Sequence, residues 1–162
     1  MITLKSNLWQ RDSNPNTVYV ATTNSIRNCN NCLVMGRGSA LELVKRIPMA
    51  DALIAITLSE MGYRLNGTED YGFILFQAPS DGKFGWGIFQ TKRHWRDVAH
   101  LETIAKSVEM LHFYATNYSH LNFRVPYPAV GCGQIGNGVP PTKKQVDKLL
   151  SILPDNVTFY HR

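Results

Sequence analysis

The sequence predicts one α/β domain, in which helices cover both faces of a mostly parallel sheet. The chain has 162 residues, a length that suits a single domain with a sizeable core. Short β-branched and apolar runs alternate with segments whose apolar residues recur every three or four positions. No internal repeat, low-complexity segment or linker interrupts this alternation, which is typical of α/β domains.

The first third of the chain supplies two expected strands and two expected helices. Residues 1–5 read as a short strand, and the apolar, β-branched run 17–24 reads as a buried parallel strand. Residues 40–47 place their apolar side chains on one helical face. A second apolar helix follows over 49–62 and ends at its last glycine.

The middle third predicts a hairpin and then the clearest helix of the chain. Residues 71–78 and 84–91 read as strands, and the Asp-Gly pair between them is typical of a hairpin turn. Apolar residues then repeat at three and four positions over 98–115, with Asp97 as the expected N-cap.

The last third predicts a strand, a helix and a final strand. Residues 123–130 read as a strand whose two prolines require an edge, a bulge or a strand end, because proline donates no backbone hydrogen bond. Thr142 and Gln145 form a capping box at the start of an expected helix over 142–153. Residues 157–161 complete the sheet.

The composition and charge of the chain restrict the classes of protein to which it can belong. The net charge of +5 and the pI of about 9.2 permit an anionic partner, but no Lys/Arg run exceeds two residues. No window approaches the ~20 apolar residues that a membrane span needs. The first residues contain no apolar segment of signal-peptide length, and three cysteines fit a reducing compartment. We therefore expect a cytoplasmic monomer with no membrane partner.

The cysteines predict neither a metal site nor a redox site. Cys29 and Cys32 form a C-x-x-C pair, but a tetrahedral zinc site needs two further ligands, and Cys132 is far along the chain. The pair also lies in an Asn-rich loop rather than at the strand-to-helix junction of a redox motif. We expect no metal and no cofactor.

Three loops that follow expected strands are candidates for ligand binding: 24–40, 91–97 and 131–138. Open α/β sheets bind ligands at the carboxyl ends of their strands, so we expect these loops to meet at one edge. The glycines of 131–138 satisfy G-x-G-x-x-G, but the motif does not open directly into a helix. That argues against a nicotinamide fingerprint.

Gly36 and Gly38 leave two interpretations open. Glycines before a helix let backbone N–H groups approach a phosphate, and the helix dipole then favours the anion. The same two glycines also suit a plain bend in the loop.

Lys92 leaves two interpretations open as well. It follows an expected strand and precedes Arg93. Neighbouring positive charge and desolvation both lower the pKa of a lysine, and a neutral amine can attack a sugar aldehyde to form a Schiff base. The alternative is a solvated lysine in a basic turn.

Taken together, the three loops resemble a known family. The stretches "TTN…VMGRGSAL", "TKRHW" and "VPYPAVGCGQIGNG" are similar to those of macrodomains, in the branch of terminal ADP-ribose protein glycohydrolase and the DNA ADP-ribosyl glycohydrolase antitoxins. Small phage and bacterial macrodomains have the same order of motifs, and the resemblance covers essentially the whole chain. It implies a three-layer α/β/α domain, with a mixed, mostly parallel sheet, that binds ADP-ribose.

The resemblance also assigns residues to the ligand. Asn24 lies near the distal ribose and has a catalytic role. Asn7 and Leu8 lie at the adenine, where the family usually has Gly-Asp before an apolar residue. The first phosphate loop consists of Met35, Gly36, Arg37, Gly38, Ser39 and Ala40. The second consists of Gly131, Cys132, Gly133, Gln134, Ile135, Gly136 and Asn137.

In the glycohydrolase branch the lysine of the Thr-Lys stretch is the proposed nucleophile, and Lys92 occupies that position. The protein-directed enzyme also has an aspartate just after Gly-Cys-Gly, where this chain has Gln134 and Ile135. The implied function is removal of ADP-ribose from DNA or protein. The alternatives are a non-catalytic ADP-ribose reader, an ADP-ribose 1″-phosphate phosphatase and a nucleic-acid-binding domain.

Overall fold

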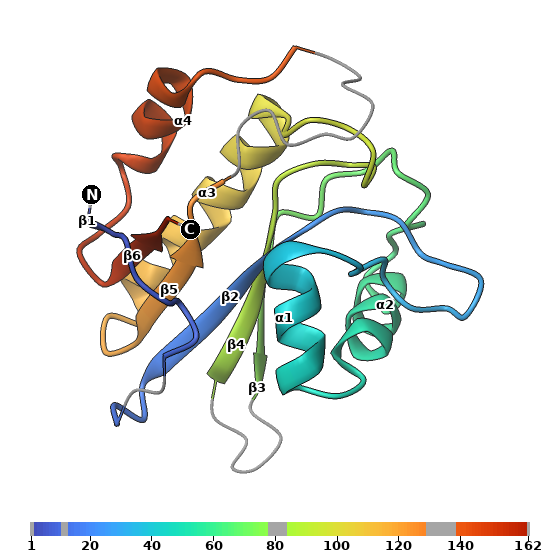
Figure 1. Cartoon of the computed structure of the whole chain (residues 1–162), viewed down its shortest axis with the longest axis horizontal. Coiled ribbons are helices and arrows are strands. Elements are labelled where there is room, and N and C mark those ends of the chain that lie inside the picture. The colour runs from blue at the N-terminus through green and yellow to red at the C-terminus, as the bar shows by residue number, and fades with distance from the viewer. Residues whose placement is uncertain (1, 11–12, 78–83, 129–138, 162) are drawn as a thin grey trace.

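A twisted sheet runs through the middle of the computed structural model, which describes residues 2–10, 13–77, 84–128 and 139–161 (Figure 1). In these residues six strands form one sheet of order β1-β6-β5-β2-β4-β3. All neighbouring strands are parallel except β3 and β4. The expected mixed, mostly parallel sheet is therefore confirmed. The strands are β1 Ile2–Leu4, β2 Thr17–Thr23, β3 Phe73–Gln77, β4 Phe84–Gln90, β5 Asn122–Pro126 and β6 Val157–Tyr160.

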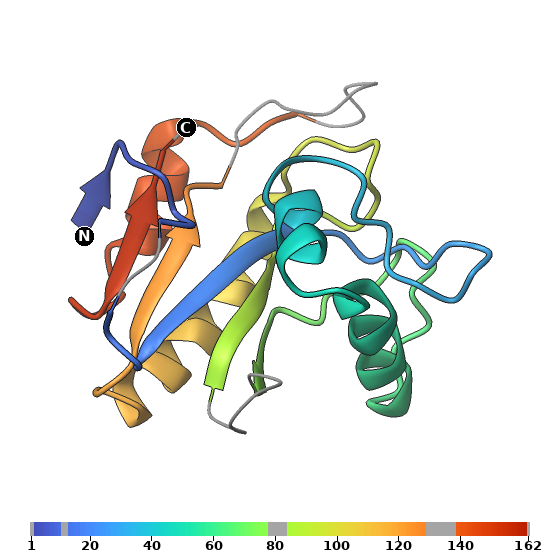
Figure 2. The same ribbon diagram turned by 60° about the horizontal axis from the view of Figure 1, so that its bottom comes forward.

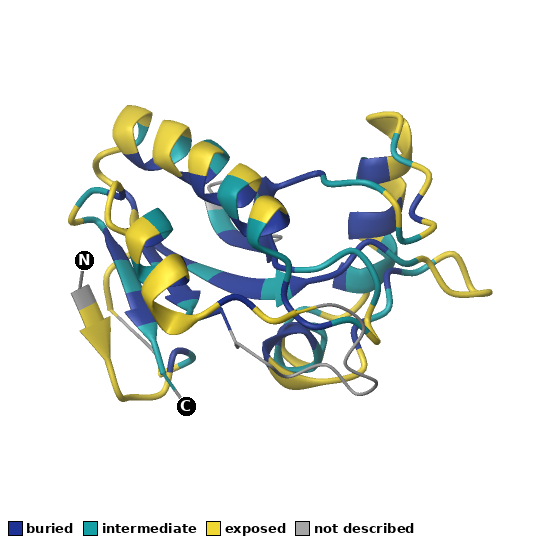
Figure 3. Ribbon diagram, turned by 90° about the horizontal axis from the view of Figure 1, so that it is seen from above, coloured by how far each residue is buried: buried dark blue, intermediate teal, exposed yellow. Residues whose placement is uncertain are grey.

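Helices cover both faces of the sheet and form the two outer layers (Figure 2). One apolar core lies between the sheet and the helices α1 (Gly38–Arg46) and α2 (Ala50–Glu60). A second core lies on the opposite face, beneath α3 (Leu101–Asn117) and α4 (Lys143–Leu150). The buried stripe of each helix faces the sheet, and its exposed stripe faces outward (Figure 3). The three-layer α/β/α arrangement is thus confirmed.

Most local signals of the sequence hold in the structure. Gly62 ends α2 with a left-handed φ of +97°, and Pro126 is the last residue of β5. The capping box at α4 is formed: Gln145 N–H donates to Thr142 Oγ1 at 3.1 Å, and Thr142 N–H donates to Gln145 Oε1 at 2.9 Å. The expected Asp-Gly turn between β3 and β4 lies outside the described residues.

The expected start of α3 is wrong. The N-cap is His100, without a side-chain capping bond, and Asp97 lies in the preceding turn. The reason is that the backbone before the helix is still tied to the sheet: His100 N–H donates to the carbonyl of Thr91 at 2.9 Å. In the described part of the chain, no helix is long and apolar enough to span a membrane.

Candidate functional site

The carboxyl ends of β2 and β4 lie side by side, because the strands are parallel neighbours with Thr23 opposite Gln90. The loops that follow these strands stay together. The N–H of Ser25 donates to the carbonyl of Arg93 at 2.8 Å. Two of the three loops expected at one sheet edge therefore meet there, whereas the third, 131–138, lies outside the described residues.

Helix α1 begins with an open N-terminus. Its N-cap, Arg37, makes no side-chain capping bond. The first intrahelical bond joins Leu41 N–H to the carbonyl of Arg37 at 3.2 Å. Among the described residues, the N–H groups of Gly38, Ser39 and Ala40 have no acceptor. Unsatisfied N–H groups and the helix dipole together make this end of α1 favourable for an anion.

Backbone conformation requires glycine at one of the two loop positions. Gly38 has a φ of +58°, in the left-handed region where an L side chain is strained. Gly36 lies outside that region, and a Cβ added at either glycine would meet nothing within 4 Å. Both glycines are exposed, so the loop leaves its backbone open to a ligand.

The buried Ser39 fixes the start of α1 to the sheet. Its Oγ accepts a hydrogen bond from the Thr22 backbone N–H at 3.0 Å and lies 3.1 Å from Thr22 Oγ1. Because Thr22 belongs to β2, the open helix end is held at a fixed place above the carboxyl end of that strand.

A cavity of about 940 Å³, here called the main cavity, lies at this edge. It brings together the expected ribose contact Asn24, the first glycine loop and the expected nucleophile Lys92. Basic side chains predominate over acidic ones in its lining, which suits an anionic ligand. The lining consists of residues 22–24, 34–40, 91–92, Trp95, 126–128, Lys143, Tyr160 and His161.

Lys92 is half-buried at the wall of the main cavity, and its Nζ donates to the carbonyl of Asp97 at 3.2 Å. That bond closes the turn after β4 around the lysine. Lys92 therefore lines the main cavity, and its Nζ is tethered within its own turn.

Gln90, fully buried at the end of β4, fixes the backbone of this turn. Its Nε2 donates to the carbonyls of Glu69 at 3.0 Å and Lys92 at 3.1 Å. Its Oε1 accepts from the N–H groups of Tyr71 at 2.7 Å and Gly72 at 3.2 Å. Gln90 is not among the residues predicted from the sequence, where its one signal is its polar side chain at the end of an otherwise apolar strand.

Asn24 is buried and its amide holds the loop between β2 and α1. Its Nδ2 donates to the carbonyl of Val34 at 2.9 Å, and its Oδ1 accepts from the N–H of Ile26 at 2.9 Å. The fully buried Tyr71 donates to the Asn24 carbonyl at 2.6 Å and also contacts Thr23 Oγ1. Burial raises the pKa of Tyr71, so this phenol stays protonated as a donor.

An ion pair between Arg93 and Asp70 supports the turn that follows β4. Arg93 donates from Nε and Nη2 to the two carboxylate oxygens of Asp70, at 3.0 and 2.8 Å, and Thr103 donates to the same carboxylate at 2.7 Å. Burial works to raise the pKa of Asp70, but the hydrogen bonds from Arg93 and Thr103 outweigh it and hold that pKa below its ordinary value. The arginine next to Lys92 is therefore neutralised by its partner.

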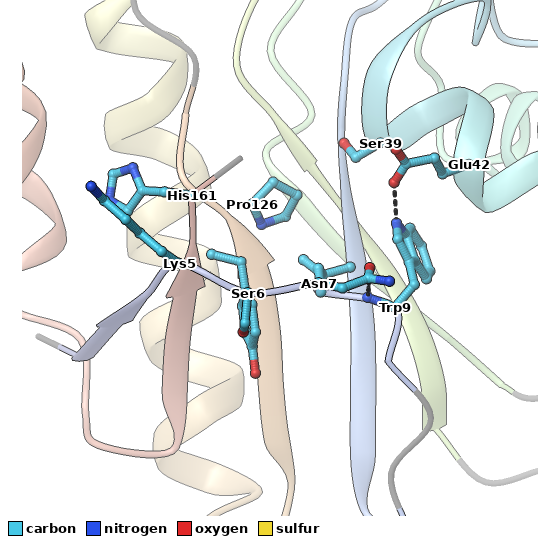
Figure 4. Close-up of a pocket in the computed structure, with 10 residues that line it drawn as sticks. Lys5, Ser6, Asn7, Trp9, Ser39, Glu42, Pro126 and His161 are labelled. Atoms are coloured by element: carbon cyan, nitrogen blue, oxygen red, sulfur yellow. Dashed lines mark hydrogen bonds between the residues drawn. The ribbon is translucent and has the colours of Figure 1, made fainter.

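A second cavity of about 530 Å³, here called the side cavity, adjoins the main one. The two share four wall residues: Ser39, Pro126, Tyr160 and His161. Figure 4 shows Glu42 of α1 reaching toward the Trp9 indole, with Asn7 beside Trp9. The remaining wall comes from the segment after β1, residues 5–9. Together the cavities form a cleft along the carboxyl edge of the sheet.

Asn7 and Leu8 line the side cavity and not the main cavity. Leu8 is buried, and Asn7 is exposed. The Oδ1 of Asn7 accepts a hydrogen bond from the Trp9 backbone N–H at 3.0 Å, which shapes the turn of its own segment. Asn7 and Leu8 thus line one cavity and residues 35–38 and Ala40 line the other, while Ser39 lines both.

The cysteines that the structure describes form no bridge: Cys29 is exposed, Cys32 is half-buried and both are free. Burial, with the nearby Asp51 carboxylate, raises the pKa of Cys32, which disfavours its reactive thiolate. No group of three His, Cys, Asp or Glu side chains suited to a metal occurs in the described ranges. Cys132 lies outside those ranges.

Comparisons with known proteins identify the fold. No protein-family model matches the chain, and no sequence among the curated proteins does. Solved structures do match. The macrodomain of Mycobacterium tuberculosis DarG has 23% identity and a TM-score of 0.68, over 99% of this chain and 97% of that one. The macrodomain of Thermus aquaticus DarG has 20% identity and a TM-score of 0.63, over 99% of this chain and 95% of that one.

A third solved structure is Thermosipho africanus DarTG in complex with ADP-ribose. It has 18% identity and a TM-score of 0.64, and the match spans 93% of this chain but only 39% of that longer one. The sheet order, the helices on both faces and these three likenesses lead to one conclusion: the chain has the macrodomain fold.

Proposed function

We propose that the chain binds ADP-ribose across the two cavities and hydrolyses the bond that joins it to DNA or protein. The observation that carries the proposal is that Lys92 and the open N-terminus of α1 line one cavity. The DarTG neighbour, whose structure contains ADP-ribose, supports the choice of ligand.

ADP-ribose would occupy both ends of the cleft. The N–H groups of Gly38, Ser39 and Ala40 would hold the pyrophosphate, with Met35 and Gly36 completing the loop around it. The distal ribose would then lie in the main cavity near Asn24, whose amide keeps a second N–H donor for it. The adenosine would extend into the side cavity, past Asn7 and Leu8. Residues 131–137 are proposed as the second phosphate loop on the sequence resemblance alone.

The catalytic part of the proposal assigns the nucleophile to Lys92. A neutral amine at Nζ attacks the anomeric carbon of the distal ribose, and a C–N bond forms as the bond to the macromolecule breaks. The leaving atom takes the bonding electron pair and the proton that the amine gives up. Water then displaces the amine, which releases ADP-ribose and restores Lys92. The contact of Nζ with the Asp97 carbonyl holds the amine at the cavity wall.

The test is incubation of the protein with ADP-ribosylated DNA, ADP-ribosylated protein and ADP-ribose 1″-phosphate. Lys92→Ala and Lys92→Arg are run alongside, and Lys148→Ala, an exposed lysine of α4, is the matched control. We expect the wild type and the control to release ADP-ribose from DNA or protein, with both Lys92 variants inactive.

Two results would contradict parts of this proposal. If Lys92→Ala cleaves as fast as the wild type, the lysine mechanism is wrong. If no variant cleaves any substrate while all bind free ADP-ribose, the chain is a reader of the modification rather than an enzyme.

A further inference from the structure

The turn that follows Lys92 carries two exposed side chains that take no part in the proposed mechanism. Trp95 is 40% exposed, and Arg96 is exposed as well. They are the two central residues of a four-residue turn, which the Asp97 N–H closes by donating to the His94 carbonyl at 3.1 Å. The carbonyl of Asp97 in turn accepts from the Lys92 Nζ. The exposed pair is therefore fixed in the same turn as the proposed nucleophile.

The ring of Trp95 lies at the mouth of the main cavity, because it lines that cavity and is exposed at the same time. Its centroid is 5.2 Å from that of the His94 ring and 5.7 Å from the guanidinium carbon of Arg96. His94 is half-buried, and a Cβ added at Gly67 would lie 3.4 Å from its Cδ2, so His94 packs on the loop before β3. Two neighbours in the turn therefore restrict the orientation of the indole.

The exposure of Trp95 is unusual within this chain. Trp86 is buried and Trp9 is half-buried. Among the exposed large apolar side chains of the described residues, Trp95 is the one that lines a cavity. An indole left open beside a binding site offers a flat apolar face, which suits the stacking of a planar ring.

Arg96 adds a positive charge that no carboxylate neutralises. Its guanidinium nitrogens lie 3.4 and 3.3 Å from the ring nitrogens of His94, and it forms no ion pair with the described residues. Arg93, by contrast, is paired with Asp70. None of the described residues that line the main cavity is acidic. The mouth of the cavity therefore presents a flat ring and a positive charge side by side, which suits an anionic partner.

We propose that Trp95 and Arg96 bind single-stranded nucleic acid beside the bound ADP-ribose. Trp95 stacks on an unpaired base next to the modified nucleotide, and Arg96 contacts a neighbouring phosphate. The inference rests on the proposed function and adds a contact outside the ADP-ribose itself. A single strand alternates flat rings with negative charges, and its bases are open to an aromatic side chain. A peptide of acidic residues would offer charge to Arg96 but no ring to Trp95.

The test measures dissociation constants by titration calorimetry in the Lys92→Ala parent, so that the linkage stays intact. One ligand is a single-stranded DNA oligonucleotide with one ADP-ribosylated nucleotide. The second is the same oligonucleotide with abasic sites on both sides of that nucleotide, which keeps the phosphates and removes the bases. An ADP-ribosylated peptide and free ADP-ribose complete the set, and free ADP-ribose is also titrated into the wild type.

The variants separate the ring from the charge. Trp95→Leu removes the flat ring and keeps an apolar side chain, whereas Trp95→Tyr keeps a ring. Arg96→Gln removes the charge. Phe113→Leu, which replaces a 61% exposed aromatic residue of α3, is the matched control for the ring. Lys148→Gln, at an exposed position of α4, is the matched control for the charge.

We expect Trp95→Leu to weaken binding of the intact strand about tenfold or more, as the loss of stacking on one base predicts. Trp95→Tyr should recover most of this loss. Binding of the abasic strand and of free ADP-ribose should be the same in Trp95→Leu as in the parent, which also shows that the variant is folded. The Phe113→Leu variant should bind every ligand as the parent does.

The charge has a readout of its own. Arg96→Gln should reduce the slope of the logarithm of strand affinity against the logarithm of salt concentration by about 0.7, as for one phosphate contact on a single strand. Trp95→Leu should leave that slope unchanged. Lys148→Gln should leave it unchanged as well, and an equal reduction in Lys148→Gln would contradict a phosphate contact by Arg96.

Equal weakening of the intact and abasic strands by Trp95→Leu overturns the inference, because the ring then contacts the ADP-ribose or only supports its turn. The inference is also wrong if Trp95→Leu weakens binding of the peptide and not of the strand. In both outcomes the wild type still binds ADP-ribose and the proposed function stands. Failure of the wild type to bind free ADP-ribose overturns both proposals.

Discussion

The side-chain amide of Gln90 donates to the backbone carbonyl of Lys92 at 3.1 Å, so the buried end of β4 sets the position of the proposed nucleophile. The same side chain accepts from two N–H groups of the segment that precedes β3. A single polar residue inside the fold therefore joins the turn that carries Lys92 to a neighbouring loop.

Replacement of Gln90 by leucine removes four hydrogen bonds and leaves buried backbone groups without partners. We expect the free energy of unfolding to fall by about 3 kcal/mol, since each unsatisfied buried group is costly. Chemical denaturation measures the change. Gln77→Leu, at the exposed end of β3, is the control and should change the free energy by no more than about 0.5 kcal/mol. Equal stability of Gln90→Leu and the wild type would contradict the bracing role.

Gly38 and Gly36 form a matched pair for testing the loop before α1. Gly38→Ala places a Cβ in the left-handed region and should lower the free energy of unfolding by about 1–2 kcal/mol. Gly36→Ala should leave the free energy of unfolding close to that of the wild type, because the added Cβ meets nothing and φ is not left-handed. Thermal and chemical denaturation of the two variants separate these outcomes. A larger loss at Gly36 than at Gly38 would contradict the described backbone.

Tyr71→Phe tests the buried phenol that holds the end of β2. Its loss removes the donor to the Asn24 carbonyl and the contact with Thr23, so we expect a loss of about 1–3 kcal/mol in the free energy of unfolding. Tyr63→Phe, whose ring centroid lies 6.2 Å from that of Tyr71, provides the comparison in the same aromatic cluster. Denaturant titration of both variants is the measurement, and a larger loss for Tyr63→Phe would refute this assignment.

The lowered pKa of Asp70 predicts how the free energy of unfolding depends on pH. Its pKa is lower in the folded protein than in the unfolded chain, where it is about 3.9. The folded state therefore binds fewer protons, and the Asp70 contribution is present above the unfolded pKa and is lost as the pH falls through the folded pKa.

We expect the free energy of unfolding to decline for the wild type below about pH 5, and Asp70→Asn to decline less steeply. Asp155→Asn removes an exposed carboxylate and is the comparison. Urea denaturation between pH 2 and 7, a range chosen to span the ~3.9 reference value, measures the slopes. If the free energy of unfolding of Asp70→Asn falls with pH as steeply as that of the wild type, the Asp70 carboxylate does not contribute to the pH dependence.

The sequence was sufficient for the fold because its elements are specified locally. The capping box at Thr142, the glycine that ends α2 and the apolar run of β2 each act within a few residues. Asp97 failed as an N-cap because the bond from the His100 N–H to the Thr91 carbonyl holds the residues between them outside the helix. Local capping preference was overridden by the sheet.

The site could be predicted less completely from the sequence than the fold. Loop glycines and Lys92 stand out by residue type and position, and the structure brings Lys92, Asn24 and residues 35–40 to one cavity. Gln90, Asp70 and Glu42 do not stand out, because their partners named above, apart from Lys92, lie between 18 and 33 residues away in the chain. Such pairings are set by the topology rather than by a motif.

The uncapped start of α1 makes ligand occupancy and helix stability thermodynamically linked. An anion bound at Gly38, Ser39 and Ala40 would take the place of the missing N-cap side chain. Any ligand that binds only the folded helix end must also stabilise the protein, in proportion to the logarithm of its concentration. The amide hydrogens of this first turn should therefore exchange rapidly in the empty protein and slowly once the cleft is filled, so hydrogen exchange there reports directly on occupancy.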